Sequence, residues 1–555
     1  MRRSLVLTVI VIGMLTAGVR AQDSKLGSVE FPTSGSEKAQ AHFLRGLATL
    51  HSFWYEEALE AFRESTKAEP DFAMGYWGEA MAHNHPLWSE QDIAAARLVL
   101  ARIKETPKLT DRERAYVGAV KLLYGEGEKQ SRDAAYSDAM EKIYRTYPED
   151  LDAAAFYSLS LLARGGGKGY RLQAKAGAIA LEVYQKNPSH PGAAHYIIHA
   201  FDDPEHAILA LPAARRYADI APEAHHARHM PSHIFLQLGM WPEAAASNEA
   251  AWESSDAWMK RKNLSVSVRD YHSLHWLLYA YLQQGRHNQA EQLLNLMKKV
   301  MSESTYDNKL RPAYYENNYA NMAAAFVVET ERWNLATELF PENKGTQATS
   351  EQSTMSGGHG GHSTTPGPSG STSATVRSSS VSLTLPFFVR GLAAAVGGSS
   401  TIEQNLAGLQ ALRSKGGRGG LEIRELEISA LSASMKKDHA KAIELMKKAT
   451  ALEEETSAPY GPPHLIKPTH ELFGEILLRA GKPVEAAAQF NVALLRQPNR
   501  ARSLLGAARA AAQNGDQAAA VTAYTTLIEQ WKQADDGLPE LQEARDYLNN
   551  TKNIR

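Results

Sequence analysis

The chain contains no cysteine, and this absence excludes several kinds of chemistry at once. Disulfide bonds, cysteine nucleophiles, cysteine-ligated zinc and iron–sulfur clusters all require a thiol. Net charge is also nearly absent, because 60 Lys and Arg residues face 62 Asp and Glu residues, a balance of −2 at pH 7. Such a surface does not favour nucleic acid or anionic lipid as a partner. Any chemistry must therefore use histidine, carboxylate, hydroxyl or amine groups.

Long apolar runs are absent after the N-terminus. The run Leu5–Val19 follows a short basic segment and is shorter than the roughly 20 residues that a membrane span needs. Compact residues at Val19 and Ala21 suit a signal peptidase, so we expect a Sec-type signal peptide over residues 1–21. No cysteine follows this run, which excludes a lipoprotein anchor. We expect a periplasmic or secreted protein without membrane insertion in its mature form.

Known catalytic signatures are missing as well. The sequence contains neither a GxSxG nor an HExxH motif, and the glycine-rich segments 165–169 and 415–420 lack P-loop spacing. We therefore predict that the protein is not an enzyme.

Amphipathic helices account for nearly all of the remaining sequence, since apolar residues recur at spacings of three and four and strand-like alternation is rare. A repeat is clearest near the C-terminus, where small, aromatic and proline residues recur at fixed offsets. Its members are Gly474, Ala486, Phe490, Ala493 and Pro498, followed 34 residues later by Ala508, Ala520, Tyr524 and Leu527. Small residues permit close approach of paired helices, the aromatic ring fills the gap, and proline ends the second helix.

This pattern resembles the tetratricopeptide repeat (TPR) family, whose 34-residue helix hairpins stack into a solenoid. The same offsets occur at Gly46, Ala58, Phe62 and Pro70, and looser copies follow around Ala244 and later alanines at spacings near 46. The sequence therefore predicts an all-α solenoid of TPR and TPR-like hairpins, with longer helices or loops taking up the excess. Four segments extend the resemblance to large exported bacterial TPR proteins of unassigned function: HFLRGLATLHSFWYEEALEAF, MGYWGEAMAHNHPLW, ARHMPSHIFLQLGMWPEA and YGPPHLIKPTHELFGEILLRAGKPVEAAAQF. The resemblance implies recognition of a protein or peptide partner.

One segment breaks the helical pattern. Of the 37 residues from Thr346 to Ser382, 26 are Gly, Ser, Thr or Pro, a composition that cannot bury enough apolar surface to fold. We predict a disordered insert over 346–382 that divides an N-terminal array, residues 22–345, from a C-terminal array, residues 383–555.

Histidines are concentrated in one region: ten of the 20 lie between His190 and His275. Positions 18, 15 and 11 before the central alanine of a unit share one stripe of the first helix, because gaps of three and four return to the same face. In TPR proteins this stripe faces the concave groove. The predicted groove residues are His226, His229, His233, His272, His275, Tyr279, Asn318 and Asn321.

Three interpretations of this stripe remain open. In the first, the histidines form a polar interior with Asp202, Asp203 or Asp270. In the second, which we adopt as the prediction, the protein is a scaffold or adaptor without catalysis whose histidines line a groove for a protein or peptide.

The third interpretation is a metal site for Zn or Cu, structural or hydrolytic, because histidine pairs at i, i+4 have the spacing of helical metal sites. Pro231 lies inside the stripe, and a helix kink there would displace His226 and His229. The candidate ligands are His195, His199, His225, His229 and His233.

Overall fold

The computed structural model describes residues 25–165, 170–303, 313–342, 373–415 and 420–552. Within these ranges the protein is all-α, as predicted, apart from two short strands. The strands β1 (Asn84–His85) and β2 (Glu90–Gln91) pair antiparallel, with Asn84 opposite Gln91. Among the described residues, no helix combines the length and the apolar character that crossing a membrane requires.

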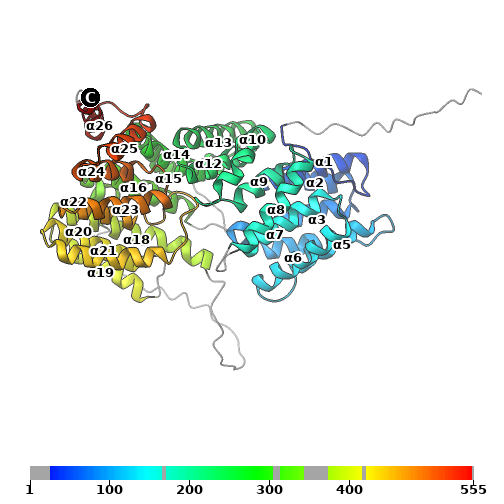
Figure 1. Cartoon of the computed structure of the whole chain (residues 1–555). Helices are drawn as coiled ribbons and strands as arrows, with labels where there is room; N and C mark the ends of the chain where they lie inside the picture. Colours follow the sequence, from blue (N-terminus) through cyan, green and yellow to red (C-terminus); the bar gives the residue numbers. More distant parts are fainter. Residues whose placement is uncertain (1–24, 166–169, 304–312, 343–372, 416–419, 553–555) are drawn as a thin grey trace, which may run out of the picture.

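Most helices pack against the next helix along the chain, which is the arrangement of stacked hairpins (Figure 1). The first part of the chain contains α1 (Glu37–His51), α2 (Tyr55–Ala68), α3 (Ala73–Met81), η1 (Pro86–Trp88, a 3-10 helix), α4 (Ile93–Leu100), α5 (Asp111–Leu123), α6 (Lys129–Thr146), α7 (Leu151–Arg164), α8 (Arg171–Lys186), α9 (Pro191–Ala200), α10 (Ala207–Ile220), α11 (His225–His229) and α12 (Pro231–Gln237). The remainder contains α13 (Trp241–Lys262), η2 (Val266–Val268), α14 (Tyr271–Gln283), α15 (His287–Glu303), α16 (Tyr314–Thr330), η3 (Trp333–Leu335), α17 (Ala336–Leu339), α18 (Ser373–Gly397), α19 (Ile402–Ser414), α20 (Leu421–Met435), α21 (His439–Glu454), α22 (Thr469–Arg479), α23 (Pro483–Arg496), α24 (Ala501–Gln513), α25 (Gln517–Gln530) and α26 (Pro539–Lys552).

The spacing that suggested TPR units corresponds to close helix packing. The ring of Phe490 fills the space beside Gly474 and Gly506, where an added Cβ would lie 2.7 Å and 2.2 Å from ring carbons. Phe62 does the same between Gly46 and Gly78 in the first unit, at 2.7 Å and 2.2 Å. In the middle of the chain the 22-residue helix α13 and the η2 connection account for part of the longer repeat spacing.

This packing makes a testable prediction for glycine substitutions. Gly506→Ala is expected to lower the free energy of unfolding by about 1–3 kcal/mol, because the new methyl group overpacks against Phe490. Gly118→Ala in α5 is the matched control, since Gly118 is exposed and its Cβ would contact nothing within 4 Å. It is expected to stabilise the helix by about 0.5–1 kcal/mol. Urea unfolding followed by circular dichroism compares the two variants. If both substitutions changed the free energy of unfolding in the same direction, the packing argument would be contradicted.

The core does not divide at the predicted insert. Helices α16 and α18, which flank it in the sequence, contact each other, and one apolar cluster runs from Phe235 to Ala510. A separate cluster spans Leu26 to Trp258, so the two cores meet near α11–α13. Residues 346–372 of the predicted insert lie outside the described residues, and its predicted end at Ser382 falls inside α18.

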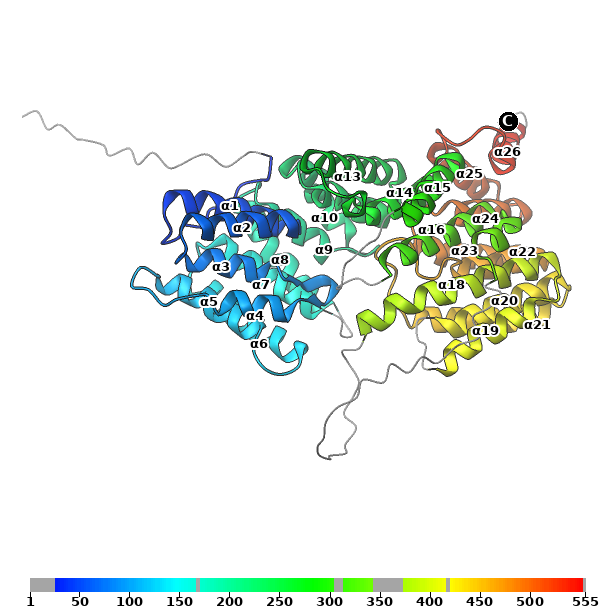
Figure 2. The ribbon, with the colours of Figure 1, turned by 180° about the vertical axis from the view of Figure 1, so that it is seen from behind.

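The solenoid curls so that its last hairpins contact the middle of the chain. The indole Nε1 of Trp241 donates a hydrogen bond to the carbonyl oxygen of Asn499 (2.8 Å), and that of Trp531 donates to the carbonyl oxygen of Gln283 (2.9 Å). In both views α13 lies between the N-terminal hairpins and the C-terminal ones (Figures 1 and 2). The histidine-bearing helices α9, α11 and α12 are therefore close to the junction of the two cores.

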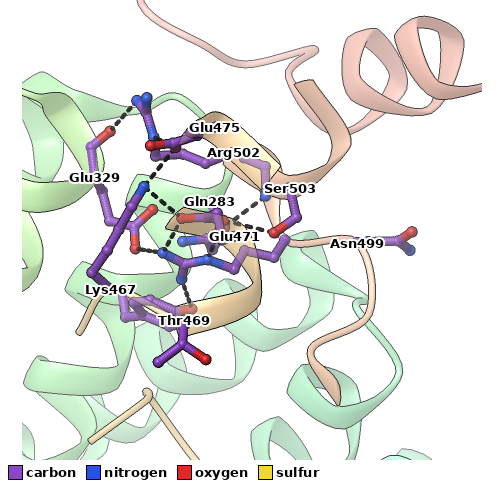
Figure 3. A network of polar contacts seen from close by, with 12 residues as sticks. Gln283, Glu329, Lys467, Thr469, Glu471, Glu475, Asn499, Arg502 and Ser503 are labelled. Carbon is purple, nitrogen blue, oxygen red and sulfur yellow. Dashed lines mark hydrogen bonds and ion pairs between the residues drawn. The ribbon is translucent and has the colours of Figure 1, made fainter. Parts of the chain in front are cut away.

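A buried network of charged side chains joins the C-terminal hairpins to α14 and α16 (Figure 3). Arg500 is fully buried at the start of α24, and its guanidinium contacts Glu471 of α22 at 2.7 Å and Glu329 of α16 at 2.6 Å. The same group donates to the hydroxyl of Tyr279 on α14 at 2.7 Å. Lys467 adds a second cation beside Glu471, at 3.0 Å.

Candidate metal centre

Four short helices bring the predicted histidines together. His195 and His199 lie on α9, which begins with Pro191 after an N-cap at His190. The next pair follows on α11 and α12, where His229 precedes and His233 follows Pro231. Met230 keeps helical dihedral angles (φ −55°, ψ −35°) between them, although α12 begins at Pro231. The i, i+4 relation survives the proline, and both pairs meet on one side of the junction.

Burial distinguishes these residues from a solvent-filled groove. His195 and His229 are 0% exposed, and His226 and His233 are 8% and 7% exposed. The indole of Trp276 covers the second pair, with its ring 4.2 Å from that of His233. These four side chains are therefore part of the interior, whereas His272, His275, Asn318 and Asn321 of the predicted groove are half-buried.

The other predicted groove residues are placed differently. Tyr279 is buried and bonded to Arg500, and Asn318 and Asn321 donate to carbonyl oxygens of their own helix, at Tyr314 and Asn317. His275 is half-buried, and burial followed by repulsion from His464 lowers its pKa to about 4. None of these four contributes to the histidine groups described next.

The second pair forms a group with His272 of α14, and the three ligand nitrogens lie within 4.8 Å of one another. Asn248 uses its amide nitrogen to donate to the carbonyl of Ala244 (2.8 Å), so its oxygen faces His229 Nδ1 at 2.6 Å. That oxygen can only accept, and the proton of neutral His229 must therefore be on Nδ1. Likewise, the Asp202 carboxylate lies 2.6 Å from Nδ1 of His233.

Both Nε2 atoms of this pair therefore carry lone pairs when the rings are neutral. They face each other at a distance of 3.1 Å. Two acceptors cannot form a hydrogen bond, so the arrangement is favourable only when a cation lies between or beside the two nitrogens. Because the protons are on Nδ1, both Nε2 atoms are free to bind a cation, and the two histidines form a candidate ligand pair.

A second group joins His195 and His199 to His226, again with all ligand nitrogens within 4.8 Å. The two α9 rings approach to 3.1 Å between their Nε2 atoms. This group borders the first, because the ring centroids of His199 and His233 are 5.7 Å apart.

A third group, His51, Asp152 and His190, has a different character. His190 Nδ1 accepts a hydrogen bond from the amide of Ala193 (3.1 Å), so its proton is on Nε2 and points toward Asp152, 3.5 Å away. His51 places Nε2 at 2.8 Å from the same carboxylate and Nδ1 at 2.9 Å from the hydroxyl of Tyr196. His51 contacts the Asp152 carboxylate at hydrogen-bond distance and His190 Nε2 faces it at 3.5 Å, so both rings direct a nitrogen at one carboxylate in a structural triad.

Electrostatics keep most of these histidines neutral. Burial, reinforced by neighbouring histidines, lowers the pKa of His195 to about 3 and that of His229 to about 3. The pKa values of His199, His226 and His272 are also lowered, and in each case burial is the largest cause. Neutral imidazole is the form that binds a metal ion, so the lone pairs are available at neutral pH.

His225 does not join either group, although the sequence made it a candidate ligand. Burial alone would lower its pKa, but the hydrogen bond from its Nδ1 to Asp270, at 3.2 Å, outweighs this and raises the pKa. The Asp270 carboxylate therefore holds the Nδ1 side of the ring, and the nitrogens of His225 are not among those that converge in either group. Its role is to pair with the aspartate that caps α14.

A segment from the far half of the chain covers the group of His229, His233 and His272. Gln237 Nε2 donates to the carbonyl oxygen of Pro459 (2.9 Å) and to Asp202 (3.2 Å), which links the α21–α22 connection to the residue that orients His233. Gly461 packs against the ring of Trp276, where a Cβ would lie 2.6 Å from the indole. This cover comes from residues more than 200 positions away in sequence, and the histidine spacing contained no signal for it.

No protein-family model matches the chain, and no curated protein matches it. Similar solved structures include yeast Tom70, at 13% identity and a TM-score of 0.33, with 93% of this chain and 89% of that chain covered. A human IFIT1 dimer with m7Gppp-AAAA has 12% identity and a TM-score of 0.33, covering 91% and 92% of the two chains. The TPR domain of P58(IPK) has 15% identity and a TM-score of 0.20, covering 72% of this chain and 99% of that one.

Proposed function

We propose that this protein is a metal-binding helical-repeat protein, in which His229, His233 and His272 hold a borderline divalent ion, Zn²⁺ or Cu²⁺. The proposal rests on the two Nε2 atoms of His229 and His233, which face each other at 3.1 Å. Each presents a lone pair, because an acceptor on the opposite side of its ring holds the proton on Nδ1. Zinc ligands at about 2.0–2.1 Å in tetrahedral geometry lie about 3.3 Å apart, close to this separation.

The surroundings of the pair match what metal-binding histidines require. Such histidines almost always use the ring N–H that does not face the metal to donate to a carboxylate, a carbonyl or a comparable acceptor. This hydrogen bond fixes the tautomer and raises the basicity of the ligand nitrogen. Asp202 does this for His233, and the amide oxygen of Asn248 does it for His229. An all-nitrogen ligand set without thiolate suits Zn²⁺ or Cu²⁺.

A proton is the alternative cation for the gap between the two rings. It would convert one of the two buried imidazoles into an imidazolium, against the burial that lowers the pKa of His229. A bridging proton also needs no third nitrogen, whereas His272 supplies one within reach of the other two. The three-nitrogen arrangement therefore supports a metal ion, and it leaves a fourth position for water or another ligand.

The helical-repeat fold is consistent with a scaffold that binds protein partners. Because His226, His229 and His233 of the predicted groove are buried, a partner would be bound by other residues. Export remains part of the proposal, and it rests on the composition of residues 1–21, which lie outside the described residues.

Elemental analysis of protein purified without a histidine tag tests the metal proposal. We expect bound Zn or Cu near a stoichiometric level, its removal by EDTA, and a lower melting temperature that Zn²⁺ restores. An ion at 100 times its dissociation constant stabilises the folded state by about 2.7 kcal/mol. His229→Gln should reduce this response, because it removes a ligand of the proposed site.

The matched control is His287→Gln, because His287 is also buried, packs edge-on against Trp531, and belongs to neither histidine group. It should retain the metal response. Since the comparison of metal-free and metal-loaded wild type needs no variant, it stands even where a variant folds poorly. A metal-free protein whose melting ignores both EDTA and Zn²⁺ would refute the proposal.

A further inference from the structure

The group formed by His195, His199 and His226 lies beside the proposed metal site and has features of its own. His195 Nδ1 is 2.7 Å from the backbone carbonyl oxygen of His51, which can only accept a hydrogen bond. The proton of neutral His195 is therefore on Nδ1, and Nε2 presents a lone pair toward His199. This is the arrangement in which a backbone carbonyl orients a metal-binding histidine.

His226 supplies an independent observation. Its ring is more than nine-tenths buried, and its Nε2 has no hydrogen-bond partner. The ring meets that of His195 edge to face, with centroids 5.0 Å apart, and its ligand nitrogen is within 4.8 Å of those of His195 and His199. A buried polar atom without a partner destabilises the fold, because it has lost its hydrogen bonds to water. A bound ion would remove this destabilisation.

Phe53 shields the same group, and its backbone is held in an unfavourable conformation. It occupies the interhelical turn five residues before the central alanine of the first unit, in the left-handed region at φ 52°. The equivalent turns of four later units use glycine, with φ between 65° and 79°: Gly239, Gly285, Gly481 and Gly515. Two others carry Glu331 and Lys437, at φ 52° and 64°. Phe53 is thus a bulky aromatic residue at a turn position whose left-handed backbone favours glycine.

The ring of Phe53 lies against the three histidines of this group. Its centroid lies 4.3 Å from that of His195, 5.9 Å from that of His199 and 5.7 Å from that of His226. The ring therefore touches all three members of the group and excludes water from one side. Strained residues that persist in folded proteins cluster at ligand sites, and this residue covers three converging nitrogens.

We propose that His195, His199 and His226 bind a second borderline divalent ion, so that the protein holds a two-ion centre. This inference rests on the proposed function, because the second ion adjoins the first. The two groups share a border at His199 and His233 and again at His226 and His229, whose ring centroids are 5.9 Å apart. Three nitrogens leave each ion an open position for water or an anionic ligand.

Zinc stoichiometry of the EDTA-stripped, full-length protein tests this inference. Equilibrium dialysis against Zn²⁺ is expected to give two ions per chain for wild type and for the His287→Gln control. His226→Gln is expected to keep one ion and His229→Gln to keep the other. The double variant should bind none.

Loading the same proteins with Cu²⁺ provides a second measurement. Two neighbouring Cu²⁺ ions broaden each other's electron paramagnetic resonance signal, and either single variant should give the sharp spectrum of an isolated ion. One ion per chain that is lost in His229→Gln and unaffected by His226→Gln would overturn the second site and leave the proposed function standing. Wild type that binds no Zn²⁺ or Cu²⁺ would overturn both.

Discussion

Replacing Arg500 with methionine is expected to lower the free energy of unfolding by about 3–5 kcal/mol, because it removes the ion-pair partner of the buried Glu329 and leaves Glu471 paired with Lys467. Glu471 and Glu329 both contact this guanidinium, and all three side chains are almost completely inaccessible to solvent. Methionine fills similar volume but offers no charge and no donor. The loss should exceed that of any surface ion pair in the protein.

Arg509→Met is the matched control. Arg509 pairs with Glu543 at 2.6 Å, and both side chains are more than one third exposed. Exposed pairs contribute about 0.2–1 kcal/mol, so this variant should unfold at nearly the wild-type urea concentration. Removing both carboxylates along with Arg500, by Glu329→Gln and Glu471→Gln, should recover part of the stability. Similar losses for Arg500→Met and Arg509→Met would contradict the network.

The network also predicts acid sensitivity. The Glu471 carboxyl is buried, which alone would raise its pKa, but Arg500 and Lys467 outweigh burial and hold the pKa well below its usual value of 4.5. A lowered carboxyl pKa stabilises the fold above the unfolded-state value, and this stability is lost as pH falls below about 4.5. In Arg500→Met that part of the acid dependence should shrink. Hydrogen exchange should then increase most in α14, α16, α22 and α24, which the network joins.

The repeat architecture was predictable because its determinants are local. Gly474, Phe490 and Gly506 lie within one unit and its neighbour, and the close approach of their helices leaves a fixed spacing in the sequence. The path of the superhelix depends instead on contacts between residues that are far apart in the sequence. Arg500 meets Tyr279 across 221 residues, and no spacing in either segment indicates that contact.

The candidate site shows the same distinction. The pairs His195/His199 and His229/His233 follow from helical periodicity, and the sequence predicts both. Their burial does not follow from it, because Trp276 and the segment around Pro459 arrive from other parts of the fold. The orienting role of Asn248 was missed for that reason.

Phe53 could have been found from sequence. It stands in the repeat register where four later units have glycine and two have Glu331 and Lys437, and it is an aromatic residue among them. The proton positions could not have been found, because they depend on which acceptor faces each Nδ1. Those positions separate the metal-binding groups from the His51–Asp152–His190 triad.

Asp202→Asn is expected to weaken Zn²⁺ binding by about 10–100-fold without unfolding the protein. The asparagine oxygen can still accept the proton of His233 Nδ1, but the lost charge makes Nε2 a poorer ligand. Asp203→Asn is the control, since the neighbouring carboxylate binds His206, at 2.8 Å, and does not reach the centre. A competition titration against a chelator of known affinity measures both variants.

The same pair of variants separates a metal ion from a proton in the gap between His229 and His233. If a proton occupied it, Asp202 would stabilise an imidazolium, and Asp202→Asn would lower the melting temperature of the metal-free protein while leaving Zn²⁺ binding equal to that of Asp203→Asn. If a metal ion occupies it, the metal-free melting temperatures should agree and the Zn²⁺ affinities should differ. The short contact between Asp202 and His233 is present in either case. The metal-free melting temperatures and the Zn²⁺ affinities, taken together, therefore decide whether a proton or a metal ion occupies the gap.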